Sequence, residues 1–162
     1  PSEDPEENFL YQRPLEDWHK VLQVNLTGVL LTNQLAVQHM LRLNIPGNII
    51  NLASIAGRRP LPGAGDYCVS KAGVIMLTQV MAAEMAAQNI RINAIGPGFI
   101  ETPMTASIRQ SPMWQEVMIG MTPMQRLGQA SEIAETALFL ASDQSSYFTG
   151  ETLFPSGGMY VG

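Results

Sequence analysis

Helical stretches alternate with short apolar runs along these 162 residues, and this alternation limits the possible folds more than any other feature. Apolar residues recur at helical spacing from Leu15 to Leu43, and Asp66 to Gln88 is a second helical stretch, rich in Ala and Met. The short runs Asn48–Ala53 and Arg91–Ile95 suit buried strands. A helix-strand alternation of this kind predicts an α/β fold with a parallel sheet.

The rest of the chain predicts connections and one further helix–strand pair. The first helix contains Asn25 and Gly28 in its middle, where they weaken helix propensity and permit a bend. A Met-rich excursion over Thr102–Gln125 is interrupted by prolines. Ser131 is then the predicted N-cap of a helix that reaches Ala141, and a final strand is predicted over Thr149–Phe154.

Both predicted internal strands end in residues suited to a site. Ser54 follows the first strand, and Gly96-Pro97-Gly98 stops the second. In open parallel sheets ligands bind beyond the carboxyl ends of the strands. The sequence therefore predicts a binding site at this edge.

Tyr67 and Lys71 lie four residues apart in the second predicted helix, so their side chains project from one face. A Lys ammonium held beside a phenol favours the phenolate. Such a pair can act as a general acid and base for a carbonyl and its alcohol. Taken alone, the pair also fits an ordinary aromatic residue and a solvated Lys, and Ser54 ahead of them favours the catalytic interpretation.

Four segments in this order and spacing resemble the catalytic half of a short-chain dehydrogenase/reductase. They are Asn25–Gly28, Asn48–Ser54, Tyr67–Lys71 and Gly96–Thr102, within a match that runs from Leu15 to Gly158. The resemblance implies a Rossmann-like doubly wound parallel sheet. It also implies an NAD(P)-dependent oxidoreductase that transfers a hydride between a nicotinamide cofactor, NAD or NADP, and a carbonyl or secondary alcohol substrate.

The resemblance implies a role for each catalytic residue. Tyr67 exchanges a proton with the substrate oxygen, and Ser54 hydrogen-bonds that oxygen. Lys71 holds the nicotinamide ribose and makes the phenol easier to deprotonate, so Tyr67 and Lys71 also border the cofactor. The backbone of Asn25 holds a water that passes the proton onward.

The same family pattern implies further cofactor contacts. Pro97 and Gly98 line one face of the nicotinamide, while the Ile100 backbone and the Thr102 hydroxyl contact its carboxamide. The Met-rich excursion matches the mobile lid of the family, although ordinary packing explains the methionines equally well. As a lid, it would favour an apolar substrate.

One expected motif is missing from the sequence. No Gly-rich turn for a pyrophosphate is found, nor the acidic or basic residue that separates NAD from NADP. The first residue is Pro1 rather than Met. We therefore expect residues 1–162 to be the catalytic and substrate-binding portion of a single Rossmann-like domain whose N-terminal nucleotide-binding portion is absent. The alternative is a protein that is naturally this short.

Composition argues against several other classes of protein. A net charge of −5 and no basic cluster larger than Arg58-Arg59 give no reason to expect nucleic-acid binding. Uninterrupted apolar runs fall short of the about 20 residues that span a membrane. The single cysteine, Cys68, indicates a reducing, cytoplasmic location. His19 and His39 share no spacing typical of metal ligands, so no metal is expected.

The substrate and the assembly stay open at this point. A 3-oxoacyl thioester reductase of fatty-acid synthesis and a polyol, sugar or small-ketone dehydrogenase are both compatible with the motifs. The family usually forms tetramers or dimers through its two long helices and C-terminal strand, so a homo-oligomer is expected. An inactive fragment that keeps only these assembly surfaces is an alternative of a different class.

Overall fold

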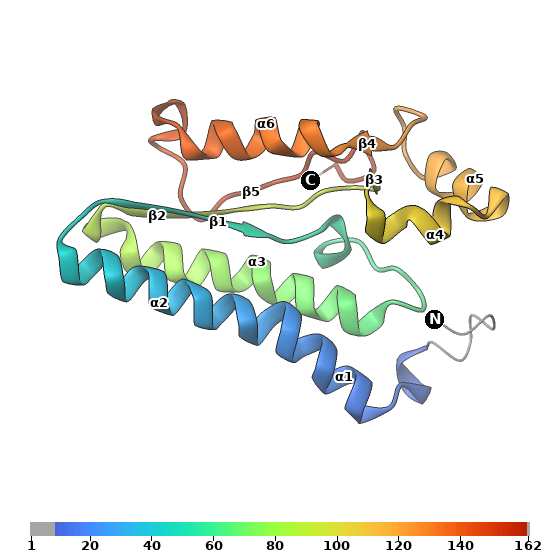
Figure 1. Ribbon diagram of the computed structural model, residues 1–162, viewed down its shortest axis with the longest axis horizontal. Helices are drawn as coiled ribbons and strands as arrows, with labels where there is room; N and C mark the ends of the chain where they lie inside the picture. Colours follow the sequence, from blue (N-terminus) through green and yellow to red (C-terminus); the bar gives the residue numbers. More distant parts are fainter. Residues whose placement is uncertain (1–8, 162) are drawn as a thin grey trace.

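A computed structural model describes residues 9–161, without the side chains of Met104, Ser107 and Ile108. A parallel sheet lies between α2 and α3 on one face and α6 on the other (Figure 1). Its strands, in spatial order, are β1 (Gly47–Leu52), β2 (Ile90–Ile95) and β5 (Thr152–Leu153). The predicted α/β class with a parallel sheet is confirmed.

The pairing of β1 with β2 forms the centre of the sheet. Six residue pairs run in register from Gly47 opposite Ile90 to Leu52 opposite Ile95. Ile90, Ile92 and Ile95 are fully buried, because helices cover both faces of β2. Near the amino ends of these strands Ile90 and Ile92 pack with the buried side chains Val37, Met81 and Ala82.

The predicted helix over Leu15–Leu43 is present as three consecutive helical segments. The α-helix α1 (Leu15–Leu22) runs into a π-helical turn, Gln23–Thr27, and then into α2 (Gly28–Leu43). The irregularity expected at Asn25 and Gly28 is therefore a π-helical turn, in which the Gly28 N–H bonds the Gln23 carbonyl.

The second predicted helix is also confirmed, as α3 (Gly65–Met85) with a 3₁₀ extension over Ala86–Gln88. By length and composition alone, Gly65–Gln88 is apolar enough to cross a membrane, which the search for uninterrupted apolar runs did not anticipate. Val74 and Ile75 are buried and pack with Ala53 and Ala94 of the sheet region. Packing against the sheet therefore accounts for part of the apolar character of α3.

Two predicted boundaries are wrong for identifiable reasons. The last strand covers only Thr152–Leu153, because Gly150 has φ +80 and interrupts the extended backbone. The helix α6 (Ala130–Ala141) is capped by Gln129, not by Ser131. The Gln129 N–H donates to Glu132 Oε2 over 2.8 Å, forming one half of a capping box.

The excursion after β2 folds into short elements that the sequence did not resolve. β3 (Ile100–Glu101) pairs in parallel with β4 (Gly128–Gln129), so the excursion begins and ends side by side. Between them lie a 3₁₀ turn (Pro103–Thr105), α4 (Ala106–Arg109) and α5 (Pro112–Gly120). These helices lie beyond the carboxyl ends of the strands (Figure 1).

Gly57 sets how closely the loop after β1 approaches α3. A Cβ at Gly57 would lie 2.8 Å from the backbone carbonyl carbon and oxygen of Lys71 and 2.7 Å from Ile75 Cδ1. Gly57 closes the 3₁₀ turn Ile55–Gly57 that follows Ser54. The loop that carries Ser54 and the helix that carries Lys71 are therefore in direct contact.

We expect Gly57→Ala to destabilise the protein by about 1–3 kcal/mol, because the helix backbone cannot move aside for a methyl group. Urea unfolding measures the change. The control is Gly120→Ala, since a Cβ at Gly120 meets nothing within 4 Å. The control should be neutral or slightly stabilising, and equal stability of the two variants would contradict the prediction.

Candidate active site

Backbone pairing continues beyond the ends of β1 and β2 and joins the two predicted ligand-binding loops. The Ala53 N–H donates to the Ile95 carbonyl over 2.8 Å, and the Ile55 N–H donates to the Pro97 carbonyl over 3.1 Å. Ser54 lies between these two bonds. Its backbone is therefore held against the segment that contains Gly96-Pro97-Gly98.

Ser54 is buried, with 8% of its surface exposed. Its Oγ accepts a hydrogen bond from the Ala56 N–H over 3.1 Å and thereby caps the 3₁₀ turn Ile55–Gly57. In the described part of the chain no acceptor is found for the Ser54 hydroxyl proton. The hydroxyl is fixed in place and can still donate to an outside oxygen.

Tyr67 and Lys71 lie on one face of α3, as predicted. The Lys71 Nζ lies 5.7 Å from the centroid of the Tyr67 ring. It also donates a hydrogen bond to the Leu52 carbonyl over 2.9 Å, at the end of β1. Burial lowers the pKa of Lys71 from its ordinary value of 10.5, because it disfavours the charged form. Lys71 thus connects Tyr67 to the strand that leads into Ser54.

Asn25 lies in the π-helical turn and reaches α3 through its side chain. Its Nδ2 donates to Ser70 Oγ over 3.3 Å, and Ser70 Oγ donates to the Tyr67 carbonyl over 2.7 Å. Ser70 is fully buried and was not singled out from the sequence. The structure therefore brings Asn25 within two hydrogen bonds of the Tyr67 backbone, and π-helical turns occur frequently at functional sites.

Gly96 and Gly98, which follow β2, leave no space for a side chain because the C-terminal segment packs against them. A Cβ at Gly96 would lie 2.5 Å from the Phe154 ring, and one at Gly98 would lie 2.8 Å from the Ser156 Cα. The Gly96 backbone therefore lies close against the ring of Phe154. The Gly98 N–H donates to the Pro155 carbonyl over 3.2 Å, which fixes this loop on the C-terminal segment.

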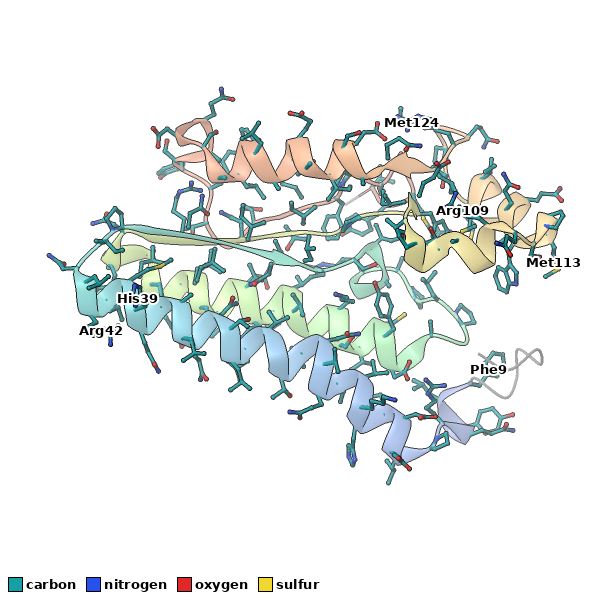
Figure 2. The ribbon with its side chains drawn as sticks, in the orientation of Figure 1. Phe9, His39, Arg42, Arg109, Met113 and Met124 are labelled. Carbon is teal, nitrogen blue, oxygen red and sulfur yellow. The ribbon has the colours of Figure 1, made fainter. Side chains whose placement is uncertain are left out.

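Ile100 and Thr102 are held by a hydroxyl that the sequence did not indicate. Thr105 Oγ1 donates to the Ile100 carbonyl over 2.8 Å and accepts from the Thr102 N–H over 3.1 Å. Arg109, the last residue of α4 (Figure 2), donates to the Thr102 carbonyl over 3.3 Å. The predicted carboxamide contacts are therefore positioned by the first turn of the excursion.

Ile100 lines a cavity of about 210 Å³, whose walls also include Phe99, Met124, Ile133 and Pro155. None of the four predicted catalytic residues lines it. Met124 lies where the excursion returns to α6, whereas Met113 lies at its outer end (Figure 2). The cavity is thus separate from the group around Ser54 and Tyr67.

A partly buried ion pair adjoins Tyr67 and was missed from the sequence. Arg13 Nε and Nη2 lie 2.8 and 2.7 Å from Asp66 Oδ2. Asp66 Oδ1 accepts a hydrogen bond from the Tyr67 N–H over 2.8 Å. The one available signal was an acidic residue in the first turn of a predicted helix. In residues 9–161, no group of three or more His, Cys, Asp or Glu residues could hold a metal ion.

A family profile described as Enoyl-(Acyl carrier protein) reductase matches residues 4–160. The chain belongs to the short-chain dehydrogenase/reductase family. It is 43% identical over 146 residues to the 3-oxoacyl-(acyl-carrier-protein) reductase FabG of Thermotoga maritima, covering 90% of this chain and 58% of that protein. It is 44% identical over 148 residues to 3beta-hydroxysteroid dehydrogenase 1 of Eggerthella lenta, covering 91% of this chain and 57% of that protein.

A solved structure of the same family supports the fold. The putative 2-deoxy-D-gluconate 3-dehydrogenase from Agrobacterium tumefaciens, with bound NADP, superimposes with a TM-score of 0.90 at 32% identity, over 93% of this chain and 61% of that one. The Rossmann-like parallel sheet implied by the resemblance is confirmed. The chain spans less than two thirds of the length of each of these short-chain dehydrogenases/reductases.

The lowered pKa of Lys71 predicts a particular dependence of stability on pH. A charged group disfavoured by burial costs stability below its folded pKa, and the cost disappears as the pH rises through that value toward 10.5. Lys71→Met removes the cost. We expect its free energy of unfolding to lack the rise that the unmodified protein shows as the pH approaches 10.5.

Denaturant unfolding at a series of pH values measures this difference. Lys20→Met, at the exposed end of α1, is the matched control and should keep the rise. A Lys71→Met profile parallel to that of the control would contradict the prediction.

Proposed function

We propose that this chain is the catalytic portion of an NAD(P)-dependent oxidoreductase that acts on a carbonyl or secondary alcohol. The observation that carries the proposal is the arrangement of Ser54, Tyr67 and Lys71. The loop after β1 carries a hydroxyl with a free proton, and α3 carries a phenol and an ammonium that bonds the end of β1. Relatives named as a reductase and a dehydrogenase support the same reaction class.

The donors at this edge fit a nicotinamide riboside. An ammonium has three N–H donors, and Lys71 gives one to the Leu52 carbonyl. Its other two suit the hydroxyls of a ribose. We assign the cofactor, NAD or NADP, to the residues that border this edge: Tyr67, Lys71, Pro97, Gly98, Ile100 and Thr102.

When bound, the cofactor supplies or accepts the hydride at its nicotinamide C4. In the reducing direction Tyr67 gives its phenolic proton to the substrate oxygen as that oxygen gains charge. Ser54 donates a hydrogen bond to the same oxygen and places it for the transfer. Lys71 stabilises the resulting phenolate, and Asn25 supports the return of a proton to the pair.

We further propose that the adenosine half of the cofactor is bound by residues outside this chain. The sequence has no Gly-rich pyrophosphate turn, and the chain matches 58% of the length of the FabG relative. The sheet is consistent with this arrangement, because within residues 9–161 β1 is paired on one side only and Leu52 at its end is 58% exposed.

Reduction of a 3-oxoacyl thioester is the specific reaction that the observations favour. The matching family description and the FabG relative both name acyl-carrier-protein substrates. On the excursion, Met113, Trp114 and Val117 are 62%, 47% and 40% exposed. Such side chains can close over an apolar acyl chain. A sugar or polyol would not draw on this apolar surface.

We propose a homo-oligomer built through the long helices. Large apolar side chains are exposed along α2 and α3, which favours a covered surface. They are Leu31 at 50%, Leu35 at 68%, Val69 at 43%, Met76 at 58% and Val80 at 47%. An inactive fragment that retains only these surfaces is the alternative. The cytoplasmic location stays a prediction from the single cysteine, Cys68, which is a free thiol.

We expect Tyr67→Phe to lower kcat at least about 100-fold, because the proton donor to the substrate oxygen is lost. The variant is measured in the protein extended upstream of Pro1, and the Kd for NADH is expected to stay within about twofold. Tyr147→Phe is the matched control, since Tyr147 is fully exposed. Full activity of Tyr67→Phe would remove the catalytic assignment, and oligomers without NADH binding would favour the inactive fragment.

Substrate class is tested with 3-oxoacyl thioesters of increasing chain length, 3-oxosteroids and keto sugar acids, each with NADH and NADPH. We expect kcat/KM to rise with acyl length, because each buried CH₂ contributes about 0.8 kcal/mol. Trp114→Ala should flatten this rise, whereas Leu41→Ala, on the exposed side of α2, should not. No turnover of any 3-oxoacyl thioester would exclude this substrate class.

A further inference from the structure

The ion pair between Arg13 and Asp66 joins two distant parts of the chain beside Tyr67. Arg13 Nε and Nη2 both contact Asp66 Oδ2, at 2.8 and 2.7 Å. The side chain of Asp66 is 6% exposed and that of Arg13 is 24% exposed. The other ion pair of the described residues, Arg126–Glu132, is 48% and 43% exposed. The Arg13–Asp66 pair is thus much less accessible to water, and water screens the attraction between its two charges less.

The second oxygen of Asp66 fixes the backbone of Tyr67. The first turn of a helix leaves N–H groups without intrahelical partners. Ala64, the N-cap of α3, has no side chain that could accept one of them. Asp66 Oδ1 instead accepts the Tyr67 N–H over 2.8 Å. Negative charge is also favourable at this end of a helix dipole.

Apolar packing holds the same two segments together. A Cβ at Gly65, the first residue of α3, would lie 2.4 Å from Leu10 Cγ. Leu10 begins the 3₁₀ turn Leu10–Gln12, which leads directly to Arg13. The start of α3 is therefore covered by a short segment that ends in the ion pair.

We propose that Arg13 and Asp66 are positioning residues for Tyr67. Arg13 orients the carboxylate, the carboxylate holds the Tyr67 N–H, and the phenol is thereby kept in reach of the substrate oxygen. The proposal rests on the catalytic role of Tyr67 proposed above. Neither side chain is required to touch the substrate or the cofactor.

A positioning role affects turnover more than binding. A displacement of about 1 Å in a reacting group can cost about 10²-fold in rate. Lys71 and the loop after β2, which are the proposed cofactor contacts, do not depend on Asp66 for any hydrogen bond described. Loss of the ion pair should therefore lower kcat while KM for both substrates stays nearly constant.

The test compares Arg13→Gln, Arg13→Lys and Asp66→Asn in the protein extended upstream of Pro1. Arg13→Gln removes the charge, while Arg13→Lys keeps the charge but loses the two-nitrogen contact. We expect Arg13→Gln to lower kcat about tenfold or more, with KM values within about twofold, and Arg13→Lys to recover part of the loss. Asp66→Asn should resemble Arg13→Gln, because its amide cannot pair with the guanidinium charge.

Two further measurements separate positioning from general destabilisation. Hydrogen exchange at the Tyr67 amide should be faster in Arg13→Gln than in the unmodified protein. Val37→Ala, which creates a cavity in the buried cluster at the other end of the sheet, is the control for lost stability. It should leave kcat and the Tyr67 amide unchanged.

Each outcome decides the proposal. Unchanged kcat and unchanged Tyr67 exchange in Arg13→Gln would overturn it, and so would a loss of kcat no larger than that of Val37→Ala. If Tyr67→Phe keeps full activity, the proposed function fails instead, and the exchange result still shows whether Arg13 holds the Tyr67 backbone.

Discussion

The parallel pairing of β1 with β2 is the interaction on which the remaining structure depends. Its register aligns Leu52 with Ile95, so both strands end at the same level. Two further backbone bonds continue the pairing through Ala53 and Ile55. A shift by one residue would turn the side chains of β2 to the opposite face and separate the two loops. The position of Ser54 relative to the Gly96–Gly98 loop is thus a property of the sheet.

The helix α3 supplies the other half of the site and is held at several points. Val74 and Ile75 bury its middle under the sheet, each contributing about 1.5–3 kcal/mol. Close contact with the loop after β1 depends on Gly57, which leaves no space for a side chain. The ion pair at Asp66 fixes the first turn of α3, which carries Tyr67, and the Lys71 bond to β1 fixes the next turn.

Hydrophobic periodicity predicted most of the fold. Helix geometry predicted that Tyr67 and Lys71 share one face of α3, while their proposed roles and that of Ser54 come from the resemblance to the family. The Arg13–Asp66 pair could not be predicted, because 53 residues separate its members and only the fold brings them together. The cap of α6 was misassigned because Gln129, an uncommon N-cap, forms the box with Glu132. The pairing of β3 with β4 involves two residues on each side, too few for any period.

The π-helical turn at Gln23–Thr27 makes helix length a determinant of the site. Such a turn holds one residue more than an α-helical turn. The extra residue is accommodated within the turn, where Asn25 reaches Ser70 Oγ and Leu26 lies against Gly73. Removing one residue there would restore a regular α-helix and take these side chains out of their contacts with α3. A single-residue deletion at this point would therefore be more harmful than a conservative substitution.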